Sequence, residues 1–161
     1  MIKKLIMTLL LACTCVVSSS AQAIYNEVRR MQKPFELVKT DESVKLDDRK
    51  VATFKWDAIE YMLYKAGEDS TFTEQQLGEQ TFAMTEFVAL FQKRLAEVGN
   101  SKSKRLNALE RFKNASISHS LFADTDKQLT LAYYNNADFV TQFSLDTDWV
   151  KALADIRSAR W

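Results

Sequence analysis

Glycine, proline and histidine are scarce in this 161-residue chain, and their scarcity excludes several classes of structure and site. The chain has three glycines, one proline and one histidine, His119. β-Sandwiches and β-barrels need many turns, which glycine and proline usually form, so this composition argues against both folds. A zinc site needs several histidine or cysteine ligands, and one histidine cannot supply them. We therefore expect no metal centre, and nothing in the sequence calls for a cofactor.

The N-terminal segment has the three parts of an export signal. Two lysines precede a largely apolar run over residues 5–17, and the small-x-small sequence Ala21-Gln22-Ala23 follows three serines. The apolar run is shorter than the roughly 20 residues of a membrane-spanning helix. We predict cleavage after Ala23, which would leave a periplasmic or secreted mature chain, Ile24 to Trp161, with no membrane span.

The two cysteines, Cys13 and Cys15, both lie inside this signal. Cleavage after Ala23 would leave the mature chain with no disulfide, so its stability must come from a packed core. The sequence Leu10-Leu11-Ala12-Cys13 also resembles the lipobox of bacterial lipoproteins, in which the cysteine is lipidated and becomes the first residue. An envelope protein anchored through Cys13 is therefore the alternative.

Charge is nearly balanced, which bears on the class of partner. Loss of the two signal lysines changes 22 basic against 21 acidic residues into 20 against 21, a net charge of −1. A general nucleic-acid-binding protein normally has a basic excess, so we expect no nucleic-acid partner.

The periodicity of apolar residues predicts one all-α domain, residues 24–161, with four to six helices. Apolar residues surround more than half of a helix over Val51 to Ala66, which places a helix at about 47–66 in the centre of a bundle. A second, strongly amphipathic helix is expected at Glu74 to Val98, opened by a Thr73/Gln76 capping box and ended by Gly99.

Weaker signals predict the other elements. They are a short first helix ended by Pro34, an extended connection over Phe35 to Lys45, a helix from Ser101 or Ser103 to about Ala115 with Leu106 inward, a helix through Tyr134, a short extended piece over Phe139 to Leu145, and a last helix capped by Asp146.

The aromatic C-terminal third supplies one candidate partner-binding site. Aromatic side chains beside amides suit a glycan or a peptide, because they combine large contact area with polar groups. The alternative is a hydrophobic core with polar turns. The candidate residues are Tyr133, Tyr134, Asn135, Asn136 and Trp149.

A basic segment supplies the second candidate. Lys93 to Lys113 holds seven basic residues against two glutamates, a net of +5 in a chain that is otherwise acidic. Such a face suits an anionic envelope polymer or lipid headgroup, although a basic run is often only a solvated helix face. We take Lys102, Lys104 and Arg105 as its candidate binding residues.

One pair of carboxylates leaves an enzymatic alternative open. Asp57 and Glu60 are one helical turn apart, and paired carboxylates can act as acid and base in glycoside hydrolysis. No nucleophile motif accompanies His119, and no other catalytic constellation is present. We therefore expect a non-catalytic envelope or secreted protein that binds a protein, peptide or glycan. The alternative is a carboxylate-dependent hydrolase that acts on envelope glycans.

The first prediction concerns the mature N-terminus. Intact-mass spectrometry of the protein from soluble and membrane fractions of its own cells should find a soluble species that begins at Ile24. A membrane species that begins at a lipid-modified Cys13 would contradict simple cleavage and support the lipoprotein alternative.

Overall fold

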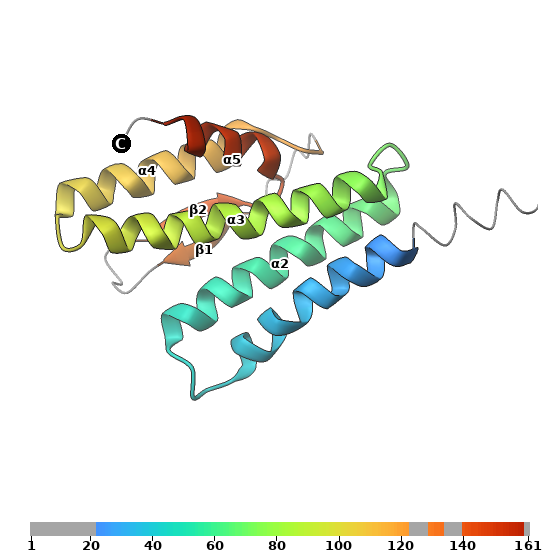
Figure 1. Ribbon diagram of the computed structural model, residues 1–161, viewed down its shortest axis with the longest axis horizontal. Coiled ribbons are helices and arrows are strands. Elements are labelled where there is room, and N and C mark those ends of the chain that lie inside the picture. Colours follow the sequence, from blue (N-terminus) through green and yellow to red (C-terminus); the bar gives the residue numbers. More distant parts are fainter. Residues whose placement is uncertain (1–21, 123–128, 134–139, 160–161) are drawn as a thin grey trace, which may run out of the picture.

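Five helices and one β-hairpin make up the residues that the computed structural model describes, 22–122, 129–133 and 140–159. Within these ranges the chain is mostly helical, as expected for the all-α class (Figure 1). The predicted export signal, apart from residues 22 and 23, lies outside them. The elements are an N-terminal helix over residues 22–40, α2 (Leu46–Glu68), α3 (Glu74–Val98), α4 (Lys102–Ser118), β1 (Leu129–Tyr133), β2 (Val140–Ser144) and α5 (Trp149–Ser158).

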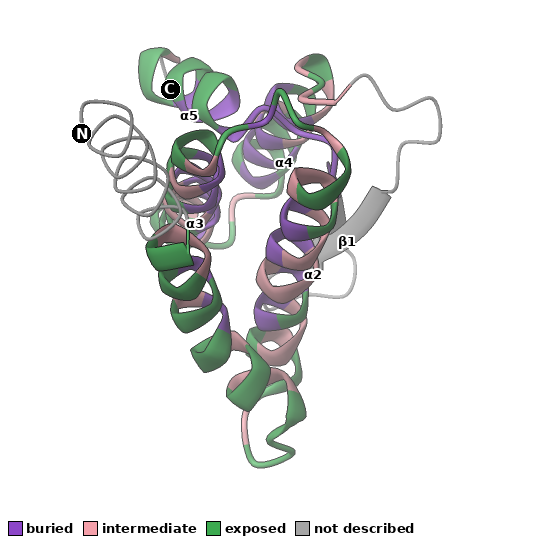
Figure 2. Ribbon diagram, turned by 90° about the vertical axis from the view of Figure 1, so that its right-hand side faces the viewer, coloured by how far each residue is buried: buried purple, intermediate pink, exposed green. Residues whose placement is uncertain are grey.

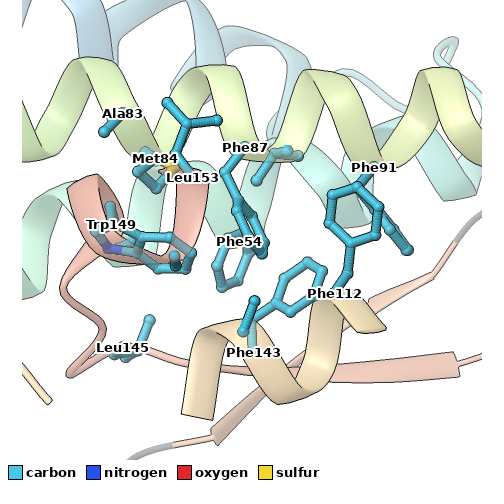
Figure 3. Close-up of a cluster of buried hydrophobic side chains, with 14 of the residues drawn as sticks. Phe54, Ala83, Met84, Phe87, Phe91, Phe112, Phe143, Leu145, Trp149 and Leu153 are labelled. Carbon is cyan, nitrogen blue, oxygen red and sulfur yellow. The ribbon is translucent and has the colours of Figure 1, made fainter. Parts of the chain in front are cut away.

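A cluster of aromatic rings forms the middle of the core. Six rings from five elements meet edge to face, with ring centroids 5.1–5.9 Å apart (Figure 3). Edge-to-face contacts of this kind stabilise a core beyond the simple burial of area, by about 0.5–1.5 kcal/mol per pair. The rings are Phe54 of α2, Phe87 and Phe91 of α3, Phe112 of α4, Phe143 of β2 and Trp149 of α5.

Helix α3 lies in the middle of this arrangement. It packs against α2 on one side and against α4 and α5 on the other (Figure 1), and the buried positions of α2 and α3 face one another (Figure 2). The prediction of its bounds is confirmed, because Thr73 and Gln76 form the capping box and Gly99 ends the helix with a φ of 54°. From Val51 to Ala66, α2 leaves only Thr53 and Tyr64 exposed. The central position of this helix in the bundle stays a prediction.

Two expected details of α2 and α4 are wrong. The sequence predicts Asp47 or Asp48 as the N-cap of α2, but the residue before this helix is Lys45, with no side-chain cap. Asp47 and Asp48 lie in the first turn, where the positive end of the helix dipole stabilises their charges. In α4, Leu106 is 45% exposed, while Arg105 takes the buried position. Leucine can remain exposed there because Leu109 and Phe112 already fill the inward face of α4.

The N-terminal helix does not end at Pro34, contrary to expectation, but continues to residue 40. Proline inside a helix removes a hydrogen bond and costs roughly 3 kcal/mol. Contacts with α2 offset part of that cost. The Lys39 ammonium lies 3.3 Å from the centroid of the Trp56 ring, and the Lys55 ammonium lies 5.1 Å from that of Phe35. Tertiary packing therefore overrides the local helix-breaking signal.

The helix expected to run through Tyr134 is also corrected. Its described part, Leu129–Tyr133, is strand β1, which pairs antiparallel with β2 in the register Leu129↔Ser144 to Tyr133↔Val140. The sequence Leu-Thr-Leu-Ala-Tyr fits either a short helix face or a strand, and a run this short cannot be assigned from periodicity alone. Pairing with β2 makes this run a strand. Strand β2 itself lies within Phe139 to Leu145, the piece expected to be extended.

Buried hydrogen bonds fasten the start of α5 to α3. The amide of Gln80, only 6% exposed, donates to the Asp148 carboxylate at 2.9 Å and accepts from the backbone N–H of Trp149 at 2.6 Å. Asp148 also accepts from the backbone N–H of Lys151 and is therefore the N-cap of α5. The expectation that Asp146 caps this helix is wrong, because Asp146 accepts from Ser120 and from the backbone N–H of Phe122 instead.

Within the described ranges, none of the helices combines the length and the apolar character needed to cross a membrane.

The second prediction tests whether the hairpin belongs to the core. Phe143→Ala should lower the free energy of unfolding by about 3–5 kcal/mol, because the ring is fully buried and contacts Phe54, Phe87 and Phe91. The matched control Phe82→Ala, at a residue 59% exposed, should change it by less than about 0.5 kcal/mol. Equal effects of the two variants in chemical denaturation would contradict this role of β2.

Candidate basic groove

Two adjoining hollows lie along the second half of α3 and share Arg94 and Glu97. One lies where the end of α3 meets the start of α4, and the other lies between α3, α4 and α5. The larger has a volume of about 510 Å³ and the smaller about 200 Å³. We call them together the basic groove. The larger is lined by Arg94, Glu97, Val98, Ser103, Lys104 and Asn107, and the smaller by Leu90, Lys93, Arg94, Glu97, Phe112, Ile156 and Arg157.

Arg105 joins the start of α4 to the end of α3, the two elements that line the larger hollow. The α3–α4 connection is a tight reversal around Gly99, so that the last turns of α3 lie beside the first turns of α4. The buried Arg105 guanidinium donates to the carbonyl oxygens of Leu95 and Gly99, each at 3.3 Å. These bonds satisfy carbonyls at the C-terminal end of α3 and place a cation at the negative end of its dipole. Arg105, predicted to bind a partner, is thus occupied within the fold.

The start of α4 is electrostatically unfavourable. Ser101 occupies the N-cap position without a side-chain hydrogen bond, and the first turn holds Lys102 and Lys104 but no acidic residue. The N-terminal end of a helix dipole is positive, so each cation there is destabilising by a few tenths of a kcal/mol. Neither lysine forms an ion pair with the described residues. An anion bound beside Lys104 would offset this repulsion.

The other charges of the groove are partly compensated. Arg94 pairs with Glu97 at 3.2 Å, and Arg157 pairs with Glu86. Lys93 is exposed and forms no ion pair with any described side chain. Positive charge therefore exceeds negative charge in the groove, although the mature chain as predicted carries a net charge of −1. The arrangement can bind a carboxylate or a phosphate.

Sequence reasoning identified only part of this site. Lys104 lines the groove, whereas Lys102 is exposed and lines neither hollow. Arg157, which no sequence signal connected to the basic segment, reaches the groove from α5. Only the folded position of α5 beside α3 reveals it.

The structure does not assemble the aromatic candidate site within its described part. Trp149 is fully buried against Phe54 and Phe87, and its ring therefore presents no surface to a partner. The buried position of Trp149 agrees with the alternative that the aromatic residues form a hydrophobic core. The side chains of Tyr133, Tyr134, Asn135 and Asn136 lie outside what the structure describes.

The carboxylate pair lies at the contact between α2 and the N-terminal helix. Glu60 accepts from Arg29 at 2.5 Å and from Gln32 at 2.9 Å, and Gln32 also donates to the Trp56 carbonyl oxygen at 3.2 Å. The hydrogen bond from Arg29 is the main reason why the pKa of Glu60 lies below its ordinary value. Burial raises the pKa of Asp57, against the opposing charge of Lys39.

These opposite pKa shifts would suit an acid and a base, but the contacts of Glu60 give it a structural role. Its carboxylate holds the N-terminal helix on α2. An incoming substrate would have to displace Arg29 and Gln32 before Glu60 could act.

His119 makes one further polar contact between elements. Its Nε2 lies 2.6 Å from a carboxylate oxygen of Asp155, which joins the end of α4 to α5. This contact favours a structural role for the single histidine. Over the ranges that the structure covers, no group of three or more acidic, histidine or cysteine side chains is arranged to hold a metal ion.

Comparison of the chain with models of protein families, with curated proteins and with solved structures finds no match. The functional argument therefore depends on the geometry and charge of the basic groove.

The third prediction concerns Glu60. Because its pKa is lower in the folded protein than its ordinary value of 4.5, the contact with Arg29 stabilises the fold above that pH and is lost as the pH falls through the folded pKa. Glu60→Gln should therefore lower the free energy of unfolding at neutral pH, by less than about 1 kcal/mol because both side chains are partly exposed.

Urea denaturation at a series of pH values measures this effect. The difference between the wild-type protein and Glu60→Gln should shrink towards low pH. The control Glu42→Gln, at an exposed glutamate, should show no such difference. A difference that stayed constant with pH would contradict the ion-pair role of Glu60.

Proposed function

We propose that this protein is an exported, non-catalytic component of the cell envelope that binds an anionic partner in the basic groove. The observation that carries the proposal is the uncapped start of α4, which holds Lys102 and Lys104 and where Lys104 lines a hollow together with Arg94. Placing cations at the positive end of a helix is unfavourable for folding, and a bound carboxylate or phosphate compensates for it.

The net charge of the mature chain limits where an anionic partner can bind. A mature chain with a net charge of −1 has no overall attraction for polyanions, so any binding must come from the local arrangement of charge. The partner is then an envelope protein, peptide or glycan that carries carboxylate or phosphate groups.

Export is part of the proposal, and the packing of Ile24 is compatible with it. The side chain of Ile24 lies beside Gly78 of α3, its Cγ2 atom 3.7 Å from the position that a Cβ would take there. The predicted mature chain thus begins at a residue that packs on the fold. A lipid anchor at Cys13 would leave the groove unchanged and tether the same domain to a membrane.

The carboxylate-dependent hydrolase has less support. Glu60 already binds Arg29 and Gln32, and an acid–base role would require those contacts to open. We therefore keep binding as the proposed function.

The fourth prediction tests the groove with polyanions. The mature chain should bind fluorescent polyphosphate and polyglutamate, with affinity that falls as salt is added. The double variant Lys93→Glu/Lys104→Glu should weaken this binding by at least about tenfold, the equivalent of about 1.4 kcal/mol.

A control variant separates the groove from overall charge. Lys33→Glu/Lys45→Glu makes the same change in net charge at two exposed lysines outside the groove. It should leave affinity within about twofold of the wild-type value, as expected for distant charges that salt screens. Equal losses in the two double variants, or no polyanion binding by the wild-type protein, would contradict the proposal.

A further inference from the structure

An apolar hollow lies beside the basic groove, between α3 and α5. Its volume is about 690 Å³. Two of its lining residues are unusually exposed for apolar side chains, Phe82 at 59% and Val150 at 43%. We call this hollow the apolar groove. It is lined by Glu79, Phe82, Ala83, Val150, Leu153, Ala154, Arg157 and Ser158.

The apolar and basic grooves are parts of one trough. Arg157 lines both the apolar groove and the smaller hollow of the basic groove. Helix α5 runs alongside α3 in the same direction, because its first residue is bound by Gln80 and Arg157 pairs with Glu86 further along. The trough therefore begins between α3 and α5 and continues to the junction of α3 with α4.

A single face of α3 forms one wall of this trough. At about 100° per residue its lining positions fall within roughly a third of the circumference, which places them on one side of the helix. From Glu79 to Glu97 they extend over about 27 Å, or roughly five helical turns. They are Glu79, Phe82, Ala83, Leu90, Lys93, Arg94 and Glu97.

We infer that the trough takes an amphipathic helical segment of a partner protein, apolar where it covers Phe82 and Val150 and acidic where it meets Lys93 and Lys104. This inference rests on the proposed function, because it names the partner that binds the basic groove. Charge complementarity with the lysines argues for the acidic end of the partner helix. The exposed apolar residues of the trough argue for its apolar end. Two neighbouring helices commonly bind a third helix through contacts spaced three and four residues apart.

A glycan fits this trough less well than a helix does. A carboxylate- or phosphate-bearing sugar would satisfy the lysines but would leave Phe82 exposed to water. Covering Phe82 requires apolar groups, and an amphipathic helix supplies them on the same face as its acidic residues. Two acidic side chains along the trough are already paired, Glu86 with Arg157 and Glu97 with Arg94. A third, Glu79, lies at the apolar end.

Synthetic helical peptides of about 18 residues, a length that spans about 27 Å, test this inference. The test peptide has leucines at three- and four-residue spacing in one half and glutamates on the same face in the other, and is made in both chain directions. One comparison peptide replaces the glutamates with lysine, and a second replaces the leucines with serine. The test peptide should bind the mature chain at least about tenfold more tightly than either.

Two variants locate the binding. Phe82→Ala should lower the affinity for the test peptide by about tenfold, as expected for an aromatic anchor. The affinity for polyphosphate should stay unchanged. Leu37→Ala removes an equally exposed apolar residue, 63% exposed on the N-terminal helix, and should have no effect. Circular dichroism confirms that each variant is folded.

The contrary outcomes are separable. If polyanions bind through Lys93 and Lys104 but the serine peptide binds as tightly as the test peptide, the inference is overturned and the proposed function stands. If neither polyanions nor peptides bind, both are overturned. Self-association of the chain in sedimentation that Phe82→Ala abolishes would overturn the inference by showing that a second copy covers the apolar groove.

Discussion

The arrangement of the C-terminal half depends on one buried amide, that of Gln80. It donates to the cap residue of α5 and accepts from the first backbone N–H of that helix, so it fixes where α5 starts along α3. Trp149 then enters the aromatic core, and Arg157 arrives beside Glu86 at the edge of the basic groove. A buried amide left without these partners would be costly, which makes this position of α5 strongly preferred.

The aromatic core and the proposed binding trough lie on neighbouring faces of the same helix. Phe87 and Phe91 of α3 face the rings of α4, β2 and α5, while Phe82, Lys93 and Arg94 lie along its outer stripe. Rigid packing of the first set holds the second in place. Binding residues supported in this way need little ordering when a partner arrives, which favours affinity.

The structure also assigns different roles to residues that look alike in the sequence. Arg105 and Lys104 are neighbours in a basic run, yet the first caps α3 from a buried position and the second lines the groove. Asp146 and Asp148 frame the same Asp-Thr-Asp triplet, yet only Asp148 caps α5. Glu60 resembles a catalytic carboxylate but fastens the N-terminal helix to α2.

The sequence by itself determined the features that are coded locally. Apolar spacing, the capping box at Thr73 and the glycine at 99 determined α3, because neighbouring residues supply every contact that these signals need. Only the tertiary structure decided the continuation of the first helix past Pro34, the pairing of β1 with β2 and the approach of Arg157 to the basic groove. Each depends on contacts between residues far apart in the chain, and the packing free energy of such contacts exceeds local preference.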